Sequence, residues 1–486
     1  MPALQPEKSH FPYPLLFAAG LSAALFFFST GFYDNWPLTW LAPLPVCLYA
    51  FQTGAGRAAL AALMSCSLGA LNLWGYLPLP LFIGSTILNA AAFAAAVLLL
   101  RSLVRSGQTG FAPLAFAAAW TAFDYVRSLA SSFGTFPSLA YTQALNLPVI
   151  QLASLTGIWG VTFLLMLVPA SLAAAWHCRR HGSRYRPVLL PAGCLLVSAL
   201  LFGACRLYLP ADGPVVTVGL TAIPATRTEL RSQDAATVNR TLQNYSRSVD
   251  ALAAAGAQVV VLPEKLAFLT PENRAAGMAL LSRTAAKNRV VLIGGLSLQQ
   301  ERLSNTAVAF APDGSPAAAY DKQNLLPPYE NRYTPGDSLA WLEIAGTAAG
   351  LAICKDMDFV RPARKYSRQG AGLLLVPALD FHDDGWLHAR IAILRGVEGN
   401  MAVARAAQWG LLTLSDSRGR ILGATATNAA AGEATLLGQL PAGGGRSLYS
   451  LTGDWLAWLC LIVTALSLRA VAAAQGFSSR ISNNRH

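Results

Sequence analysis

Charged residues are scarce in this chain. Only 12% of its 486 residues are Asp, Glu, Lys or Arg, whereas 54% are hydrophobic and the mean hydropathy is +0.43. Average soluble domains carry about 25% charged residues. Long apolar runs lie before residue 209 and after residue 450, and most acidic residues lie between them. This composition excludes a wholly water-soluble chain. It predicts a membrane protein with one soluble domain, with boundaries at 1–208, 209–449 and 450–486.

Paired cysteines are also missing. The seven cysteines show neither the CxxC spacing of many metal sites nor a paired framework. Six of them lie in or beside apolar segments, which leaves Cys354 as the one cysteine between residues 209 and 449. The soluble part therefore cannot form an internal disulfide, and we expect neither a metal nor another cofactor.

The excess of basic residues does not indicate nucleic-acid binding. The formal net charge is +12, but the basic residues do not form one patch with interleaved aromatic residues. Many of them stand at the ends of apolar segments, where membrane topology accounts for them. We therefore expect no nucleic-acid partner.

Eight apolar stretches approach the roughly 20 residues that a helix needs to cross a bilayer. They lie near residues 13–33, 37–53, 57–77, 80–100, 112–131, 157–177, 188–208 and 453–474. The second contains three prolines and is the weakest candidate. The first has no clear small-residue cleavage site, so we interpret it as a retained helix and not as a signal peptide.

The loops between these stretches indicate their sidedness. Arg57, Arg101, Arg105 and the basic run 179–186 lie in alternate loops, whereas the intervening loops 34–36 and 78–79 contain no Lys or Arg. Basic loops stay on the cytoplasmic side of a membrane. Seven crossings then predict that residues 209–449 lie outside the cytoplasm and that the eighth returns the tail.

Short β runs alternate with helical stretches in the soluble part. Strands are expected near 215–220, 259–264, 290–295, 305–310, 373–377, 402–406 and 411–414, and helices near 235–255, 273–288, 360–369 and 385–400. This alternation, followed by hairpins, predicts an α/β sandwich.

Cys354 is the strongest candidate for a catalytic residue. It follows a strand-like run at 349–353 and precedes Lys355 and Asp356. A thiol beside a cation has the surroundings of a nucleophile whose thiolate is favoured. A free cysteine is more commonly a buried structural residue, but the charged neighbours favour the catalytic interpretation.

Two further residues could share a site with Cys354. Glu264 ends an almost entirely apolar strand, where burial can raise the proton affinity of a carboxylate and make it a proton acceptor. Lys322 follows a hairpin and could stabilise a developing oxyanion. Taken singly, Glu264 could instead start a helix, and Lys322 could be a solvated charge, as most lysines are.

Three short motifs resemble the nitrilase, or carbon–nitrogen hydrolase, superfamily. They are Pro263-Glu264, Tyr320-Asp321-Lys322 and Ile353-Cys354, supported by Ser304-Asn305-Thr306, Asp313-Gly314, Ala389-Arg390 and Glu398-Gly399-Asn400. The resemblance implies a four-layer α-β-β-α sandwich. It also implies that Glu264 is the general base, Lys322 the oxyanion stabiliser and Cys354 the nucleophile that forms a thioester.

The whole chain is similar to the bacterial apolipoprotein N-acyltransferase family. The similar runs are 136–143, 150–153, 156–161 and 448–455, and Asp124 and Arg127 stand where the family tends to carry an acid and an arginine. The resemblance implies an enzyme of the bacterial inner membrane. It would move a fatty acyl chain from a phospholipid to the N-terminal amine of a diacylglyceryl-modified lipoprotein, with its soluble domain in the periplasm. We expect a monomer.

The sequence departs from this family around the substrate. The residues after the nucleophile read Lys-Asp where the family has Tyr-Glu, and the loop after the lysine reads Pro-Pro-Tyr-Glu-Asn where it has Pro-Phe-Gly-Glu-Tyr. Glu330 in this loop matches a further functional Glu of the family, although a solvated loop acid is nearly as good an interpretation. We expect Glu330, Lys355, Asp356 and Trp386 to bind or position substrates.

Three functions remain open at this point. The first is the lipoprotein N-acyltransferase. The second is a divergent paralogue, either a membrane-tethered amidase or an acyltransferase with another amine acceptor. The third is a non-catalytic membrane scaffold or transporter, and the presence of Glu264, Lys322 and Cys354 together counts against it.

Overall fold

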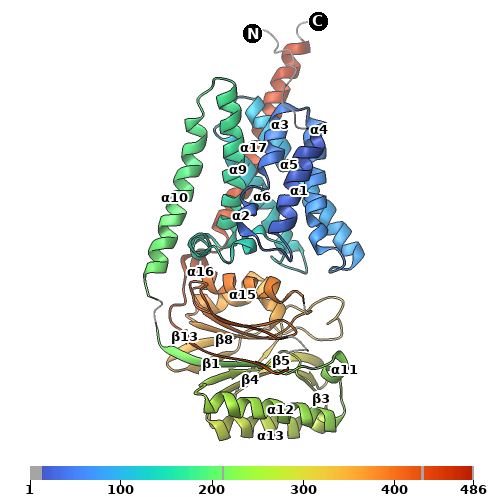
Figure 1. Ribbon diagram of the computed structural model, residues 1–486, viewed down its shortest axis with the longest axis vertical. Coiled ribbons are helices and arrows are strands. Elements are labelled where there is room, and N and C mark those ends of the chain that lie inside the picture. Colours follow the sequence, from blue (N-terminus) through green and yellow to red (C-terminus); the bar gives the residue numbers. More distant parts are fainter. Residues whose placement is uncertain (1–13, 211–212, 382, 428–431, 484–486) are drawn as a thin grey trace.

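The protein has two parts, a helical bundle and an α/β domain stacked end to end (Figure 1). The computed structural model describes residues 14–210, 213–381, 383–427 and 432–483. Helix α1 (Leu15–Ser29) begins, and helix α17 (Trp455–Asn483) ends, at the end of the bundle that is remote from the α/β domain. The expected combination of a helical bundle and an α/β domain is confirmed.

Long apolar helices form the bundle. Besides α1 and α17, they are α4 (Ala55–Gly69), α5 (Leu79–Arg105), α6 (Ala112–Ala130), α9 (Ile158–Arg180) and α10 (Arg186–Tyr208). Among the described residues, five helical segments are long and apolar enough to cross a membrane: Ala55–Leu73, Leu79–Arg105, Ile158–Arg180, Arg186–Tyr208 and Trp455–Ala473. Helix α1 is apolar but shorter. Helix α6 is not among the five, because Asp124 and Arg127 lower its mean hydropathy.

The stretch expected at 37–53 does run between the two ends of the bundle, since Asp34 pairs with Arg390 of the α/β domain and Thr53 accepts from Arg101 and Arg105, but it is not one continuous helix. The structure has two short helices here, α2 (Trp36–Thr39) and α3 (Leu44–Gln52), separated by a turn. Proline lacks a backbone N–H and clashes with the preceding turn, so it is tolerated in the first turn of a helix and breaks its interior. Pro37 and Pro45 each lie in the first turn of their helix, and Pro43 caps α3.

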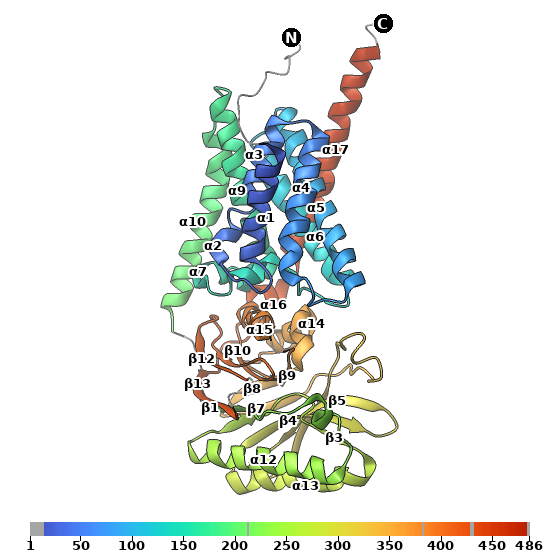
Figure 2. The same ribbon diagram turned by 45° about the vertical axis from the view of Figure 1, so that its right-hand side comes forward.

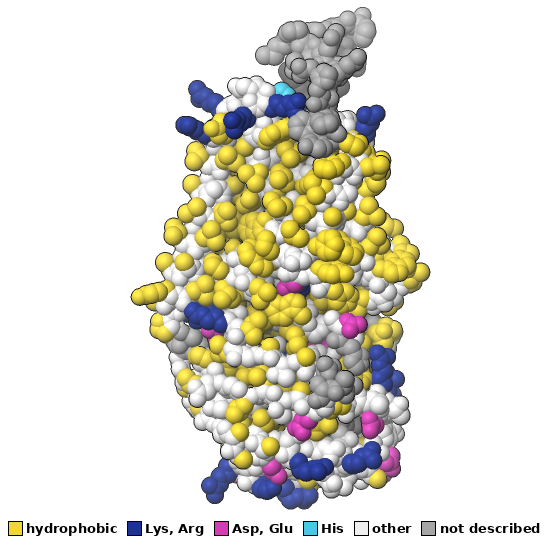
Figure 3. Space-filling model, viewed as in Figure 1, with side chains coloured by type: hydrophobic (Ala, Val, Ile, Leu, Met, Phe, Trp, Pro, Cys, Tyr) yellow, Lys and Arg dark blue, Asp and Glu magenta, His cyan; other side chains and the backbone are white. Residues whose placement is uncertain are grey.

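The basic loops lie together at the end of the bundle that is remote from the α/β domain. Arg101 and Arg105 both donate hydrogen bonds to the carbonyl oxygen of Thr53, at 2.7 and 3.3 Å. The rings of Phe51 and His177 lie 5.2 Å apart, which brings the run 179–186 to the same place. Figure 3 shows Lys and Arg side chains gathered at this end, above a broad apolar surface. The alternate loops that carry the basic residues in the sequence therefore lie together at one end of the folded bundle.

Two mixed sheets form the centre of the α/β domain. The first has the order β13 (Ala434–Pro441), β1 (Val215–Ala222), β2 (Val259–Val261), β4 (Val291–Gln299), β5 (Leu303–Phe310) and β6 (Pro316–Asp321), with β3 (Ala267–Leu269) beside β4. The second has the order β12 (Ile421–Ala426), β11 (Leu411–Ser415), β10 (Ala402–Gln408), β9 (Leu373–Leu379), β8 (Thr347–Leu351) and β7 (Trp341–Ile344). Apolar side chains from both sheets, among them Leu220 and Leu375, fill the core between them without any exposure.

Helices cover the outer face of each sheet and complete four layers. Helices α12 (Ala235–Ala254) and α13 (Pro271–Asn288) cover the first sheet on the side away from the bundle (Figure 2). Helices α14 (Val360–Arg368) and α15 (Gly385–Gly399) lie between the second sheet and the bundle (Figure 2). Strands β1, β2 and β4 run parallel, as do β8, β9 and β10. The carboxyl ends of each parallel set meet at one edge, where ligand sites of such sheets form.

A buried polar network on α15 joins the two parts. Arg395 forms an ion pair with Glu398 and donates to the Thr135 hydroxyl at 2.6 Å. Glu398 in turn accepts a hydrogen bond of 2.8 Å from the backbone N–H of Ile158, at the start of α9. Arg395 is 1% exposed and Glu398 3% exposed. The buried charges of Arg395 and Glu398 therefore compensate each other.

We expect Glu398→Ala to destabilise the protein by about 3–5 kcal/mol, because it leaves the Arg395 charge buried without a partner. Thermal unfolding of the full chain in detergent measures the loss. Glu343→Ala on the exposed face of β7 is the matched control and should change stability by less than about 0.5 kcal/mol. Equal unfolding temperatures for the two variants would contradict this account of the junction.

Candidate active site

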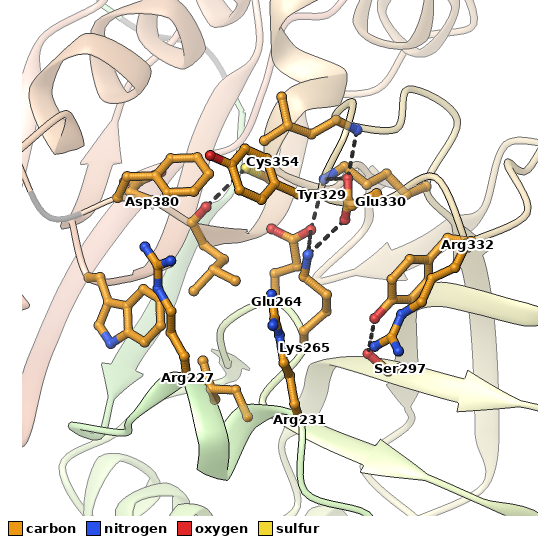
Figure 4. Close-up of a pocket in the computed structure, with 17 residues that line it drawn as sticks. Arg227, Arg231, Glu264, Lys265, Ser297, Tyr329, Glu330, Arg332, Cys354 and Asp380 are labelled. Atoms are coloured by element: carbon orange, nitrogen blue, oxygen red, sulfur yellow. Dashed lines mark hydrogen bonds and ion pairs between the residues drawn. The ribbon is translucent and has the colours of Figure 1, made fainter. Parts of the chain in front are cut away.

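The three residues expected to be catalytic line one cavity of about 330 Å³ at the carboxyl ends of the strands (Figure 4). Glu264 stands three residues beyond β2, Lys322 directly follows β6, and Cys354 lies three residues beyond β8. The backbone at Glu264 is packed closely, since a Cβ built on Gly295 would lie 2.6 Å from the Glu264 Cα. Only glycine fits at position 295. Its close approach fixes the backbone of Glu264, from which the carboxylate side chain extends.

Lys322 is held between two carboxylates. Its Nζ lies 2.8 Å from Oε1 of Glu264 and 2.8 Å from Oε2 of Glu330. A second ammonium, Lys265, lies 2.7 Å from Oε1 of Glu330. The amide of Asn305 donates to Glu264 at 2.6 Å and to Glu330 at 2.8 Å. Two cations and two anions thus balance in a buried cluster (Figure 4).

This pairing decides the protonation of the cluster. Burial alone would lower the pKa of Lys322, but the charges of Glu264 and Glu330 raise it well above the ordinary value. Burial would raise the pKa of Glu330, but Lys322 and Lys265 hold it well below the ordinary value. Lys322 is therefore a permanent cation at neutral pH. An ammonium has three donors, and the two carboxylates occupy two of them, so one remains to stabilise an oxyanion.

One oxygen of Glu264 is left without a partner. Oε1 accepts from Lys322 and Asn305, whereas Oε2 is buried and has no hydrogen-bond partner among the described residues. Burying a carboxylate oxygen is unfavourable unless a hydrogen-bond donor reaches it. In a cavity that also contains a thiol, this oxygen is the atom that can take a proton.

Cys354 sits on a strained turn with a neutral thiol. Its φ of +44° lies in the left-handed region that non-glycine residues rarely adopt, and such strain occurs at functional sites. The sulfur is partly exposed and contacts the carbonyl oxygen of Leu379 at 3.6 Å. Burial, together with the charge of Glu264, raises the pKa of the thiol, while Lys322 lowers it. The resting group is thus a thiol that needs a base.

The effect expected of Lys355 on the thiol is wrong. The interpretation of Cys354 assumed that this neighbouring cation favours the thiolate, yet the pKa of Cys354 is raised. Lys355 donates instead to the carbonyl oxygen of Ser132 in the bundle and lies 4.3 Å from the centre of the Phe133 ring. Burial lowers the pKa of Lys355. Lys355 is not among the residues that line the cavity. It joins the turn after Cys354 to the bundle.

Asp356 supports the cavity from behind. It is fully buried and accepts hydrogen bonds from the hydroxyl of Tyr320 at 2.9 Å and the backbone N–H of Ile353 at 3.1 Å. It also accepts from the backbone and side chain of Asn324, both at 2.9 Å. Asp356 therefore ties the nucleophile's strand to the segment around Lys322, and it does not line the cavity.

Of the remaining two expected residues, Glu330 lies in the cavity and Trp386 lies outside it. Glu330 lies inside the cavity, where it pairs with both lysines and accepts a hydrogen bond of 2.9 Å from the backbone N–H of Leu326. Trp386 lies on α15 and donates its ring N–H to Asp34 of the bundle. The structure thus places Trp386 at the junction of the two parts and not at the thiol.

Sequence reasoning missed two members of the cluster. Asn305 lies in a motif that supported the resemblance, but nothing in the sequence shows that its amide reaches two carboxylates from a neighbouring strand. Lys265 adjoins Glu264 in the sequence, and its φ of +52° turns the chain so that the ammonium reaches Glu330. The position of Lys265 next to Glu264 in the sequence was the one signal that could have identified it.

The cavity continues toward the bundle. A second cavity of about 540 Å³ shares Arg227, Leu326, Tyr329 and Phe381 with the first. The rings of Tyr329 and Phe381 lie 5.4 Å apart where the two meet. On its far side, the second cavity is lined by apolar residues of the bundle, including Phe32, Trp74, Leu81 and Phe133. Two adjoining cavities therefore lead from the thiol toward the bundle, and the lining on the bundle side is apolar although Arg227 and Asp383 also line the second cavity.

A group of ligand-type side chains beside the cavity does not suit a metal. One atom each of Asp380, Asp384 and His388 lies within 4.8 Å of the others. However, Asp380 is already bound through both oxygens by the guanidinium of Arg405. Asp384 raises the pKa of His388 against the effect of burial, and a protonated imidazole cannot ligate a metal. The donor set is that of an ion-pair network, to which Tyr76 of the bundle adds a hydrogen bond of 2.6 Å to Asp384.

Both parts of the chain are similar to known proteins. The family model for carbon–nitrogen hydrolases matches residues 226–441, and that for the N-terminal domain of apolipoprotein N-acyltransferase matches residues 22–171. The chain is 28% identical to an apolipoprotein N-acyltransferase of Geobacter metallireducens, over 94% of this chain and 95% of that one. It is 26% identical to one of Gloeobacter violaceus, over 91% of each. An amidase structure from Nesterenkonia sp. is 21% identical and covers 48% of this chain and 93% of its own, with a TM-score of 0.41.

Fold and relatives together define the class of protein. It is a membrane-associated acyltransferase whose α/β domain has the carbon–nitrogen hydrolase fold. Within that class, the chain is similar over nearly its whole length to apolipoprotein N-acyltransferases.

Replacing Glu264 with Gln should separate two properties of the thiol. Loss of a general base lowers the rate of acylation of Cys354 by about 10²–10⁴-fold. Loss of the negative charge also lowers the thiol pKa, so the pH profile of alkylation by iodoacetamide should shift to lower pH than in the wild-type protein. Mass spectrometry of the Cys354 peptide, in samples quenched at successive times, measures the rate of acylation and the rate of alkylation. Glu343→Gln should change neither, and an unshifted alkylation profile in Glu264→Gln would refute the electrostatic account.

Proposed function

We propose that this chain transfers a fatty acyl chain from a phospholipid to the N-terminal amine of a diacylglyceryl-modified lipoprotein, through a thioester on Cys354. The observation that carries the proposal is the unpartnered Oε2 of Glu264 in the same cavity as a neutral thiol and a fixed ammonium. Glu264 acts as the base, Lys322 stabilises the oxyanion and Cys354 is the nucleophile.

In the first half-reaction the phospholipid ester is the acyl donor. Oε2 of Glu264 takes the thiol proton as Sγ of Cys354 attacks the ester carbonyl carbon. The free donor of Lys322 stabilises the tetrahedral oxyanion. The intermediate then expels the lysophospholipid alkoxide, which receives the proton from Glu264. The products are a thioester, a neutral alcohol and a carboxylate ready for a second cycle.

In the second half-reaction a neutral amine is the acceptor. Its nitrogen attacks the thioester carbonyl, and Glu264 takes the proton that the nitrogen loses. The sulfur leaves and recovers that proton, so that amide and thiol are the products. While Glu264 holds the proton, the negative charge of the oxyanion replaces that of the carboxylate beside Lys322, and the carboxylate is restored when the proton leaves. Glu330 and Lys265 keep Lys322 in place and do not exchange protons.

Lipid substrates account for the position of the cavity. Both the donor and the lipidated acceptor are confined to a bilayer, and two adjoining cavities, the second lined on the bundle side by Phe32, Trp74, Leu81 and Phe133, lead from the helices to the thiol. Tyr329 and Phe381 line both cavities. We infer that acyl chains reach Cys354 through them.

The acyl-transfer proposal is tested with the full chain in phospholipid nanodiscs. Mass spectrometry should find a fatty acyl adduct on the Cys354 peptide that hydroxylamine removes, and a diacylated lipopeptide should then become triacylated. Cys354→Ser should form no hydroxylamine-labile adduct. Free fatty acid released in place of triacylated product would favour hydrolysis, and the absence of any adduct would refute the covalent mechanism.

We further infer that the chain lies in the bacterial inner membrane with its α/β domain in the periplasm. The basic loops gather at the opposite end of the bundle, and the positive-inside rule assigns that end to the cytoplasm.

Cysteine labelling in intact cells measures this sidedness. Asp337→Cys, at an exposed position of the α/β domain, should react with a membrane-impermeant maleimide above the wild-type background. Ser183→Cys, in the exposed loop between α9 and α10, should react only after the cells are permeabilised. The reverse pattern would overturn the orientation.

A further inference from the structure

Basic side chains outnumber acidic ones around the catalytic cavity. The basic residues that line it are Lys265, Lys322, Arg227, Arg231 and Arg332, and the acidic ones are Glu264, Glu330 and Asp380. Glu264 and Glu330 pair with the two lysines, and Asp380 pairs with Arg405, which does not line the cavity. The carboxylates of the lining are therefore already compensated, and none of them forms an ion pair with the three arginines.

Two of these arginines belong to one short segment. Arg227 begins helix α11 (Arg227–Leu230) and Arg231 caps its C-terminal end. Residues four positions apart on a helical turn are neighbours on its surface. Both side chains are exposed and line the cavity. In Figure 4 Arg227 and Arg332 stand on opposite sides of Glu264, so Arg332 is separate from this pair.

The acid between the two arginines is engaged elsewhere. Oε2 of Glu229 accepts hydrogen bonds from the backbone N–H and the hydroxyl of Thr226, at 2.8 and 2.9 Å, and so closes a capping box. Its Oε1 lies 3.9 Å from Arg240 on α12. Asp383 lines the adjoining cavity together with Arg227. Among the described residues, neither Arg227 nor Arg231 forms an ion pair with these or other carboxylates.

Trp409 holds Arg227 in position. The Cζ of Arg227 lies 5.8 Å from the centre of the Trp409 ring, and the ring N–H donates to the carbonyl oxygen of Ala225 at 2.9 Å. The φ of Trp409 is +58°, in the region that non-glycine residues rarely adopt and that is enriched at functional sites. Stacking occupies one face of a guanidinium and leaves the N–H groups in its plane for an anion.

The position of Arg227 suits one part of the acyl donor. Arg227 lines both the catalytic cavity and the adjoining cavity that leads to the bundle. Only glycerol carbons separate the esters of a phospholipid from its phosphate. When an ester carbonyl lies at Cys354 and its acyl chain extends toward the bundle, the phosphate must therefore lie in this cavity or at its rim. Guanidinium groups bind phosphate oxygens through two parallel N–H donors.

We propose that Arg227 and Arg231 bind the phosphate of the phospholipid that donates the acyl chain. This inference rests on the proposed acyl transfer and adds the residues that select the donor. The phosphodiester is common to all phosphoglycerides, so the pair selects this class of lipid and not one head group. Neither arginine touches a reacting atom. By binding the phosphate they position the ester carbonyl at Cys354.

Selection by phosphate also separates the two substrates of the proposed reaction. The diacylglyceryl-modified acceptor carries acyl esters of its own, which Cys354 could attack in the same way as those of the donor. The acceptor has no phosphate on its glycerol. A site that holds the donor by its phosphate therefore favours removal of an acyl chain from the phospholipid over removal from the acceptor.

Two acyl donors test this site in the full chain in detergent. One is dipalmitoyl phosphatidylglycerol, and the other is dipalmitoylglycerol, which has the same esters and lacks the phosphate. Mass spectrometry of the Cys354 peptide in quenched samples gives the rate of acylation by each donor. Arg227→Gln should lower the rate with the phospholipid about tenfold, because a charge-assisted contact is lost. The rate with dipalmitoylglycerol should stay within about twofold, and Arg227→Lys, which keeps the charge, should recover part of the phospholipid rate.

Arg332→Gln removes the same charge from the opposite side of the cavity and is the matched control. It should leave the ratio of the two rates within about twofold of the wild-type ratio. An equal fall of this ratio in Arg332→Gln, or an unchanged ratio in Arg227→Gln, would overturn the inference, while the wild-type adduct would still support acyl transfer. Absence of an adduct from the wild-type protein would instead refute acyl transfer and the inference with it. If inorganic phosphate raised the wild-type rate with dipalmitoylglycerol to that with the phospholipid, the arginines would bind a free anion and the assignment to the donor would fail.

Discussion

The catalytic cavity depends on the charge balance around Lys322. An ammonium buried alone would be strongly unfavourable, and so would either of the carboxylates that bind it. Lys322, Lys265, Glu264 and Glu330 are favourable only together, with Asn305 donating to both acids. This mutual requirement fixes the geometry and leaves Oε2 of Glu264 without a donor. Burial and, after it, the charge of Glu264 raise the pKa of the Cys354 thiol, so that the thiol is protonated at rest in the proposed reaction.

The second constraint is the attachment of the α/β domain to the bundle through α15. At its N-terminal end Asp384 binds Tyr76, and near its C-terminal end Glu398 binds the backbone of Ile158. Between them, Arg390 pairs with Asp34. A helix is a rigid element, so contacts along its whole length hold the cavity at one height and one angle over the helices. The proposed acyl transfer between substrates anchored in a bilayer would need this fixed height.

Of the two residues after Cys354, Lys355 belongs to this attachment, whereas Asp356 bonds within the α/β domain, and neither residue lines the cavity. Lys355 reaches Ser132 and the ring of Phe133, and Asp356 binds Tyr320 and the segment at Asn324. Both are bonded next to the strained turn at Cys354. The Lys355-Asp356 pair therefore concerns how the turn at Cys354 is supported, while Glu264, Lys322 and Cys354 line the cavity together.

The sequence by itself determined the two-part organisation and most of the elements, because long apolar runs and alternating β and helical patterns are local properties. It also placed Glu264 and Cys354 at the ends of strand-like runs and Lys322 after a hairpin, and the ends of parallel strands meet at one edge. It could not show that prolines break the stretch at 37–53, that Lys355 turns away from the thiol, or that Trp386 faces the bundle. Only the tertiary structure decided the protonation of Cys354 and the partners of Lys265, Asn305 and Arg227. Burial and the distances between charges from distant segments govern those properties, and both exist only once the chain has folded.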